Sequence, residues 1–141
     1  MLKSLTKKNN MSNTTTLKRK VEKEVEKKVL VVEDEGAMGL VLDMVLNERK
    51  FQMDYVNNLL AADEYLQKQI PSIIILDNKL PDGFGVDFIS YIKKKYPSIK
   101  IVMISGLSSA RDVAMENGAD VFLDKPFSMD EFNKAIDQLL N

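Results

Sequence analysis

Side chains suited to chemistry follow several short apolar runs of this sequence. Glu33 and Asp34 follow the first such run, Asp77 follows another, and Ser105 ends a third. Lys125 follows a further run after one intervening residue. Carboxylates that converge raise one another's pKa unless a cation or a proton compensates. Carboxylates with a lysine and a serine nearby would therefore suit a hard cation, Mg²⁺ above all, together with a phosphoryl group.

Two absent residue types narrow the chemistry further. The 141 residues include no cysteine, which excludes a disulfide framework and thiolate metal or redox sites. They also include no histidine, which removes the commonest general base, the commonest zinc ligand and any phosphohistidine on this chain. The residue types leave open whether a phosphoryl group would end on a substrate, on water or on the protein itself.

The spacing of apolar residues predicts five strand–helix repeats that would position these side chains. Strands are predicted over residues 29–32, 51–56, 73–76, 99–104 and 121–123, and helices over 37–50, 59–69, 86–96, 108–117 and 129–140. Residues 77–85 are rich in turn formers and are predicted to form a loop. The alternation predicts a parallel sheet with helices on both faces, in which ligands bind beyond the carboxyl ends of the strands. The runs 29–32, 73–76 and 99–104 lack polar alternation and should be the central strands.

Local signals also predict two helix ends. Gly118 follows the fourth predicted helix, where a glycine commonly occupies the C′ position. Ser128 precedes the fifth, and Glu131 three residues later completes a capping box.

Charge is distributed unevenly along the chain, although the net charge is only −1. The first 20 residues contain six basic side chains and no acidic one, whereas the remainder carries 21 acidic against 14 basic groups. We expect a basic, disordered tail over residues 1–27 and one domain over residues 28–141. The apolar runs are too short to span a bilayer, and the N-terminus lacks the pattern of a secretory signal, so we expect a cytoplasmic protein.

From about Lys28 to Leu140 the sequence resembles the receiver domains of two-component response regulators. The matching motifs are Val-Val-Glu33-Asp34-Glu35, Ile-Ile-Leu-Asp77 with Pro81 and Gly85 after it, Val-Met-Ile-Ser105-Gly106, and Lys125-Pro126-Phe127. Each motif is common by itself, but all four occur in the family's order at predicted strand ends. The resemblance implies a stand-alone, chemotaxis-regulator-like domain. Its fold would be α/β, a doubly wound five-stranded parallel sheet of the (βα)5 flavodoxin-like type with strand order 2-1-3-4-5.

The resemblance also implies a phosphoacceptor and a metal site. Asp77 would be the nucleophile that takes a phosphoryl group from a phosphohistidine. Asp34 would bind Mg²⁺ directly and Glu33 through water. Asp77 and the backbone carbonyl of Lys79 would supply further ligands. The predicted cofactor is therefore Mg²⁺.

Three further residues would respond to the phosphoryl group. Lys125 would pair with its oxygens, and Ser105 would donate its hydroxyl to one of them. Phe122 would turn inward when that hydroxyl moves. Phe122 stands where tyrosine is commoner in the family and lacks the hydroxyl for one switch hydrogen bond. The family also implies a cis peptide bond between Lys125 and Pro126. The segment between Ser105 and Lys125 is shorter than usual, so the fourth helix should be curtailed.

The resemblance implies a signalling domain that is not an enzyme beyond its own phosphorylation and slow autodephosphorylation. Its partners would be a histidine kinase or histidine phosphotransfer protein and an unidentified downstream protein. We expect no output domain on this chain, no direct binding to nucleic acid, no membrane span, and a monomer or weak dimer.

Three other functions would use similar features. A hydrolase of the haloacid-dehalogenase type needs a second aspartate two residues after the nucleophile, where Lys79 stands. Flavodoxin-like cofactor binding needs a phosphate loop rich in serine, threonine or glycine after the first strand, where three acidic residues would instead repel phosphate. An interaction module that is never phosphorylated would not need the intact set of site residues.

Overall fold

A computed structural model describes residues 27–140 of the chain. The predicted basic tail therefore lies outside the described residues, apart from its last position. The strands are β1 (Lys28–Val32), β2 (Gln52–Val56), β3 (Ile73–Asp77), β4 (Lys79–Leu80), β5 (Gly83–Phe84), β6 (Lys100–Ser105) and β7 (Val121–Asp124). The helices are α2 (Gly36–Glu48), α3 (Leu59–Lys68), α4 (Ile89–Lys95), α5 (Arg111–Glu116) and α6 (Met129–Leu140). None of these helices is long and apolar enough to cross a membrane.

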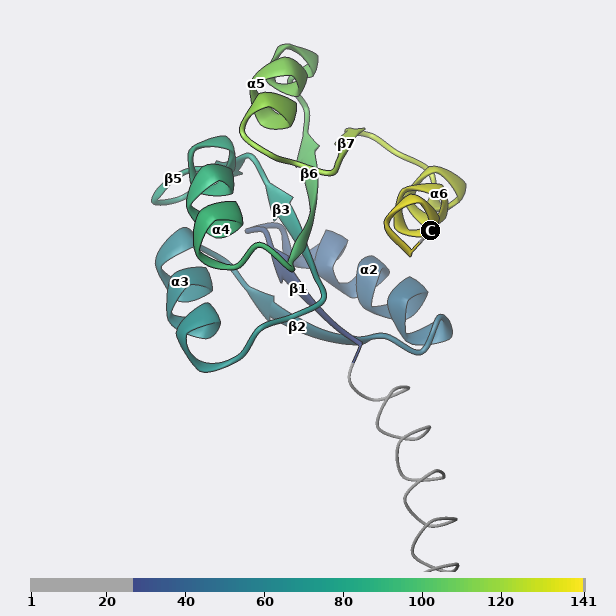
Figure 1. Ribbon diagram of the computed structural model, residues 1–141. Helices are drawn as coiled ribbons and strands as arrows, with labels where there is room; N and C mark the ends of the chain where they lie inside the picture. Colours follow the sequence, from purple (N-terminus) through teal and green to yellow (C-terminus); the bar gives the residue numbers. More distant parts are fainter. Residues whose placement is uncertain (1–26, 141) are drawn as a thin grey trace, which may run out of the picture.

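The five longer strands form one parallel sheet in the order β2-β1-β3-β6-β7 (Figure 1). The predicted order 2-1-3-4-5 is thus confirmed. The three runs without polar alternation are the inner strands β1, β3 and β6, as predicted. They are buried almost throughout because helices cover both of their faces.

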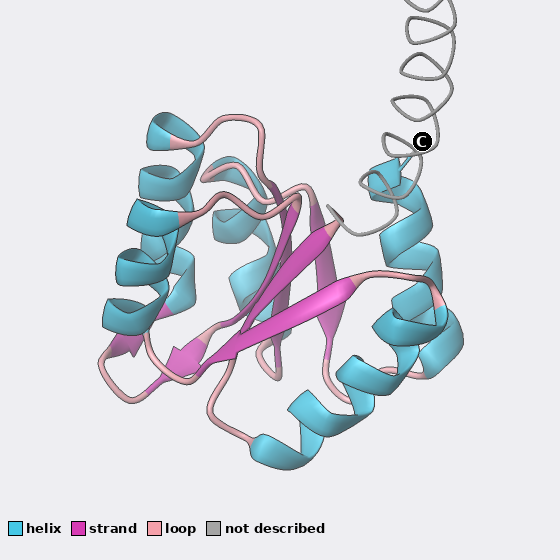
Figure 2. Ribbon diagram, turned by 90° about the horizontal axis from the view of Figure 1, so that it is seen from below, coloured by secondary structure: helices cyan, strands magenta, loops and turns pink. Residues whose placement is uncertain are grey.

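Each face of the sheet carries its own apolar core, and the two helical layers are seen in Figure 2. Alternate strand residues such as Leu30 and Ile74 pack with α3, α4 and α5 on one face. Their neighbours Val31 and Ile75 pack with α2 and α6 on the other. This period of two follows from the strand geometry, which sends successive side chains to opposite faces. The two cores fix the strands and thereby fix where their carboxyl ends stand.

Two helix ends follow the local signals of the sequence. The Ser128 hydroxyl accepts a hydrogen bond from the Glu131 amide at 3.1 Å, and the Glu131 carboxylate accepts one from the Ser128 amide at 3.3 Å. This is the predicted capping box at the start of α6. Gly118, just beyond α5, has a φ of 112°, which a glycine adopts without the steric strain of a side chain.

The segment after β3 differs from the sequence prediction. Residues 77–85 were predicted to be a loop, but they contain the short antiparallel pair β4–β5. The helix predicted over 86–96 begins as a 3₁₀ turn, η1 (Gly85–Phe88), and becomes α-helical only from Ile89. Asn78 explains this start, because its carbonyl and its side-chain oxygen accept hydrogen bonds from the amides of Gly85 and Val86.

The fourth helix is curtailed, as predicted. A 3₁₀ turn, η2 (Ser108–Ala110), leads into the six residues of α5. The helix predicted over 108–117 is therefore only partly α-helical, and a short element faces the end of β7.

Candidate functional site

The predicted site residues meet at one edge of the sheet. A cavity of about 690 Å³ opens beyond the carboxyl ends of β1, β3 and β6. Its lining includes Asp34, Asp77, Lys79, Ser105 and Lys125, all of which the sequence singled out. These positions lie together because the carboxyl ends of parallel strands meet at the same edge of the sheet.

Asp77 is the last residue of β3 and is only 4 % exposed. Lys125 Nζ lies 2.8 Å from Asp77 Oδ2 and forms a salt bridge with it. The Lys125–Pro126 peptide bond is cis, as the resemblance implied. The close approach of the next turn to Asp77 also requires Gly85, because a Cβ there would lie 2.2 Å from the Asp77 carbonyl oxygen. The Asp77 carboxylate thus faces the cavity with the ammonium group of Lys125 beside it.

Three carboxylates converge beside this salt bridge. One oxygen each from Glu33, Asp34 and Asp77 can be chosen so that all three lie within 4.8 Å of one another. Glu33 and Asp77 are buried and Asp34 is exposed. Such clustered oxygen ligands, without sulfur or imidazole, suit a hard divalent cation.

The surroundings of Glu33 are the most direct support for a cation-binding site here. Burial raises the pKa of its carboxyl, and the charge of Asp77 adds to the increase. Hydrogen bonds lower that pKa, the largest from the Glu35 amide, which donates to Glu33 Oε2 at 2.6 Å. Oε1 is buried and has no hydrogen-bond partner. A buried carboxylate oxygen without a partner is costly, and a bound cation would remove that cost. The residues present therefore fit a divalent metal ion.

Ser105 ends β6, and Phe122 lies within the neighbouring strand β7, opposite Met103. Ser105 is buried, and its hydroxyl oxygen accepts a hydrogen bond from the Leu107 amide at 3.0 Å. A serine that accepts in this way still has its own hydrogen to donate. Phe122, on β7, is only 6 % exposed, so its ring already faces inward. The guanidinium of Arg111 lies over that ring at 4.7 Å and pairs with Asp124 at 2.8 Å.

Sequence reasoning did not single out three residues around the site. Asn78 organises the turn that follows Asp77, Arg111 covers Phe122, and Tyr55 lies against Glu33 and Gly39. Tyr55 was predicted only as part of the strand over residues 51–56. No local pattern marks Arg111 or Tyr55, because each contacts a residue of another segment. Lys79 lines the cavity, but metal binding by its carbonyl stays a prediction.

Comparison with known families and proteins agrees with this geometry. The family model described as the response regulator receiver domain matches residues 29–137. The chain is 32% identical over 114 residues to the transcriptional regulatory protein KdpE of Staphylococcus aureus, covering 79% of this chain and 49% of KdpE. It is 33% identical over 109 residues to the phosphate regulon transcriptional regulatory protein PhoB of Escherichia coli, covering 74% of this chain and 48% of PhoB. The chain thus spans about half the length of these relatives.

Solved structures show the same fold. The beryllofluoride-activated NtrC4 receiver domain dimer has a TM-score of 0.76 and 34% identity, with 80% of this chain and 95% of that chain covered. The response regulator TrrA of Thermotoga maritima, in complex with Mg²⁺ and beryllofluoride, has a TM-score of 0.73 and 28% identity. That match covers 80% of this chain and 98% of TrrA.

Proposed function

We propose that this chain, which belongs to the response regulator receiver domain family, accepts a phosphoryl group on Asp77 and thereby switches a protein-interaction surface. The observation that carries the proposal is the placement of Asp77. It is a buried carboxylate that ends a central strand, faces an open cavity, and has a lysine at 2.8 Å and two further carboxylates nearby. Phosphorylation on aspartate and Mg²⁺ binding are features of this family.

The residues divide the transfer reaction among themselves. An oxygen of Asp77 forms a bond to the phosphorus of a phosphohistidine, while the P–N bond breaks and its electron pair returns to the imidazole of the donor. Lys125 balances negative charge on the phosphoryl oxygens from a position already fixed by its salt bridge. Bound Mg²⁺ supplies further charge neutralisation in this type of reaction. Glu33, Asp34 and Asp77 would hold it, with the Lys79 carbonyl as a further ligand.

Ser105 links the reaction to the rest of the domain. A new phosphoryl group offers strong acceptor oxygens, and the Ser105 hydroxyl gains a charge-assisted hydrogen bond by moving toward them. This movement would change the packing around Phe122, whose ring is already buried and lies under Arg111. The affected surface is formed by η2, α5 and β7, and it would present the phosphorylated state to a downstream protein.

We also propose the class of partner and the limits of the chemistry. The phosphoryl donor is a histidine kinase or a histidine phosphotransfer protein. The chain acts as a phosphoacceptor and not as an enzyme that turns over a separate substrate. It exists as a monomer or a weak dimer, and it resides in the cytoplasm. The dimer described for activated NtrC4 supports association upon phosphorylation.

Labelling with a phosphodonor tests the proposal. The full chain should incorporate label from radioactive acetyl phosphate in Mg²⁺ but not in EDTA, and the label should be stable to acid and released by base. Asp77→Asn should abolish it. Asp54→Asn is a matched control, because Asp54 lies on β2 and accepts a hydrogen bond from Tyr65 away from the cavity. Labelling of Asp77→Asn at the wild-type level would contradict the assignment of the phosphoacceptor.

A further inference from the structure

Tyr55 on β2 shares a small space with Glu33 and Gly39. Tyr55 pairs with Val31 in the parallel register, and the Glu33 amide donates to the Val56 carbonyl, so the two side chains leave the sheet close together. A Cβ built on Gly39 would lie 2.9 Å from Tyr55 Cε2 and 3.1 Å from Glu33 Oε1. The Tyr55 ring and the unpartnered Glu33 oxygen therefore both press against the same point of α2.

Gly39 indicates that this contact matters. It is a buried residue inside α2, where glycine is among the least favourable residues. Its backbone shows no positive φ, so conformational freedom does not explain it. The limited space explains the glycine, because any larger residue would displace either the Tyr55 ring or the Glu33 carboxylate. The helix gives up stability at this position, and the result is room for both groups.

The chemistry of a phenol suits this position. The nearby Tyr55 hydroxyl lowers the pKa of Glu33 by hydrogen bonding, although burial raises that pKa more. Burial also raises the pKa of Tyr55, as do the charges of Glu33 and Asp34. Glu33 Oε1 is buried and has no hydrogen-bond partner in the structure. A hydrogen bond from the Tyr55 hydroxyl would give this oxygen a partner.

A neutral donor has an advantage over a charged one here. A lysine or arginine beside Glu33 would add positive charge that competes with a metal ion. A phenol can fix one carboxylate oxygen and leave the negative charge of the cluster unchanged. Lys125 already supplies the positive charge that Asp77 and a phosphoryl group need.

We infer that Tyr55 is a positioning residue of the metal site. Its hydroxyl donates to the Glu33 carboxylate and holds it in the orientation that the cation requires. The inference rests on the proposed function, because it assumes that Glu33, Asp34 and Asp77 bind Mg²⁺. Groups of this kind, which orient a metal ligand, commonly change metal affinity by about 10–100-fold when they are removed.

The test compares Tyr55→Phe with Tyr91→Phe in the full chain. Both tyrosines are similarly exposed, at 38% and 36%. The Tyr91 hydroxyl, on α4, donates to Asp63 on α3 and not to a carboxylate of the proposed metal site. Titration calorimetry with MgCl₂ should show a Kd about tenfold higher for Tyr55→Phe and unchanged for Tyr91→Phe. Melting in EDTA should be the same for wild type and Tyr55→Phe, because the ring and its packing are retained. Mg²⁺ should also perturb the near-ultraviolet tyrosine absorption of wild type and Tyr91→Phe, and not that of Tyr55→Phe.

The possible results separate the inference from the proposed function. If wild type binds no Mg²⁺, the metal site and the role of Tyr55 are both wrong. If wild type binds Mg²⁺ and Tyr55→Phe binds it equally well, only the role of Tyr55 is wrong. A lower melting temperature of Tyr55→Phe in EDTA, in proportion to its weaker binding, would indicate a purely structural residue and overturn the inference.

Gly39→Ala gives a second, independent measurement. Its Cβ should displace the Tyr55 ring and weaken Mg²⁺ binding, and adding Tyr55→Phe should then cause little further loss. Such non-additivity is expected when two residues act through one contact. Losses that multiply in the double variant would overturn the inference.

Discussion

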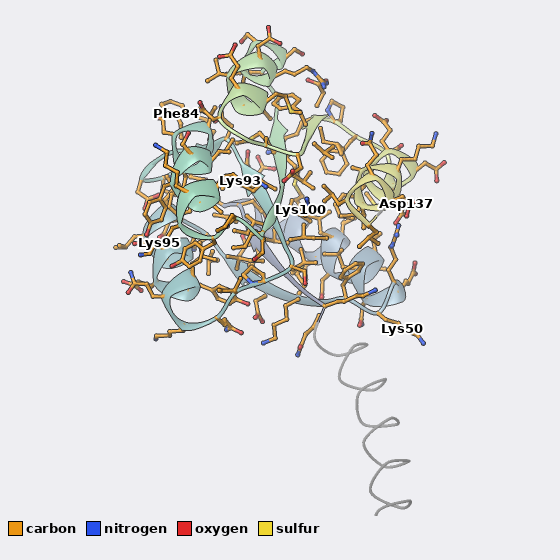
Figure 3. All side chains as sticks on the ribbon, in the orientation of Figure 1. Lys50, Phe84, Lys93, Lys95, Lys100 and Asp137 are labelled. Atoms are coloured by element: carbon orange, nitrogen blue, oxygen red, sulfur yellow. The ribbon has the colours of Figure 1, made fainter. Side chains whose placement is uncertain are left out.

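The two ends of the sheet use the same kinds of side chain in opposite ways. At the amino ends of β6 and β7, Lys93 reaches from α4 (Figure 3) and donates to Asp120 Oδ2 at 2.7 Å and to the Ile99 carbonyl at 2.8 Å. Asp120 also accepts from the Ile101 amide. At the carboxyl ends, three carboxylates converge, Lys125 pairs with Asp77 alone among them, and Glu33 Oε1 has no hydrogen-bond partner.

This difference distinguishes a structural ion pair from a site prepared for a ligand. Around Lys93 and Asp120 one positive charge meets one negative charge, and the backbone groups between them are satisfied. Around Asp77 negative charge is in excess, and the buried Glu33 Oε1 has no hydrogen-bond partner in the structure.

Removing one carboxylate of the cluster of Glu33, Asp34 and Asp77 should abolish the stabilisation of the fold by Mg²⁺. Millimolar Mg²⁺ should raise the melting temperature of wild type, with a gain of about 2.7 kcal/mol where Mg²⁺ exceeds its Kd 100-fold. Asp34→Ala should lose this gain, because Asp34 offers one of the three converging oxygens. Melting curves in EDTA and in MgCl₂ measure it. An equal shift in wild type and Asp34→Ala would show that Mg²⁺ binds elsewhere.

Breaking the ion pair of Lys93 and Asp120 should destabilise the fold and leave Mg²⁺ binding unchanged. Asp120→Ala removes the acceptor of the Ile101 amide and the ion-pair partner of Lys93, and we expect a loss of about 1–3 kcal/mol in the free energy of unfolding. Denaturant unfolding measures the loss. The upward shift of melting temperature in Mg²⁺ should match that of wild type, and a smaller shift would mean that the two ends of the sheet are coupled.

Glu33 should make the metal-free protein less stable at neutral pH. Its folded-state pKa is raised, so its contribution to stability is fully present below the ordinary value of 4.5 and is lost as pH rises through the raised pKa. Glu33→Gln removes this loss and should stabilise the protein in EDTA at pH 7, with no gain near pH 4. Melting curves at both pH values measure it, with exposed Glu48→Gln as the control. A gain at both pH values would exclude ionisation as the cause.

The smallest effect on stability is expected at Arg111. Its pair with Asp124 is about half exposed, and its contact with Phe122 adds a cation–π interaction. Arg111→Ala should therefore cost less than about 1 kcal/mol of unfolding free energy. We expect Arg111→Ala to weaken the response of this surface to phosphorylation more clearly, because the Phe122 ring loses its contact with the guanidinium.

Amide chemical shifts with and without beryllofluoride would report the switch. In wild type the changes should extend from Asp77 to residues 106–122, and in Arg111→Ala they should be smaller there. Arg49→Ala is the control, because Arg49 pairs with Asp137 between α2 and α6. Changes confined to the neighbourhood of Asp77 in wild type would mean that this surface does not respond to phosphorylation.

The strand–helix order, the central strands and the positions of the site residues were all predictable from the amino-acid sequence. Apolar runs and helix spacing are local patterns, and the capping box of Ser128 and Glu131 spans only three residues. Asp77 and Ser105 were predictable because each ends an apolar strand, and parallel strands end at one edge. Their chemical roles, and the nature of the basic tail, stay predictions.

The contacts between residues of different elements were not predictable and are seen in the folded domain. The contact of Tyr55 with Glu33 and Gly39, the cover of Arg111 over Phe122, and the pairing of Lys93 with Asp120 join separate segments. The 3₁₀ start at Gly85 likewise depends on how the chain folds back on Asn78. Such contacts depend on strand register, sheet twist and the close packing of helices on each face. No short sequence pattern encodes those relations, because each is set by the whole fold at once.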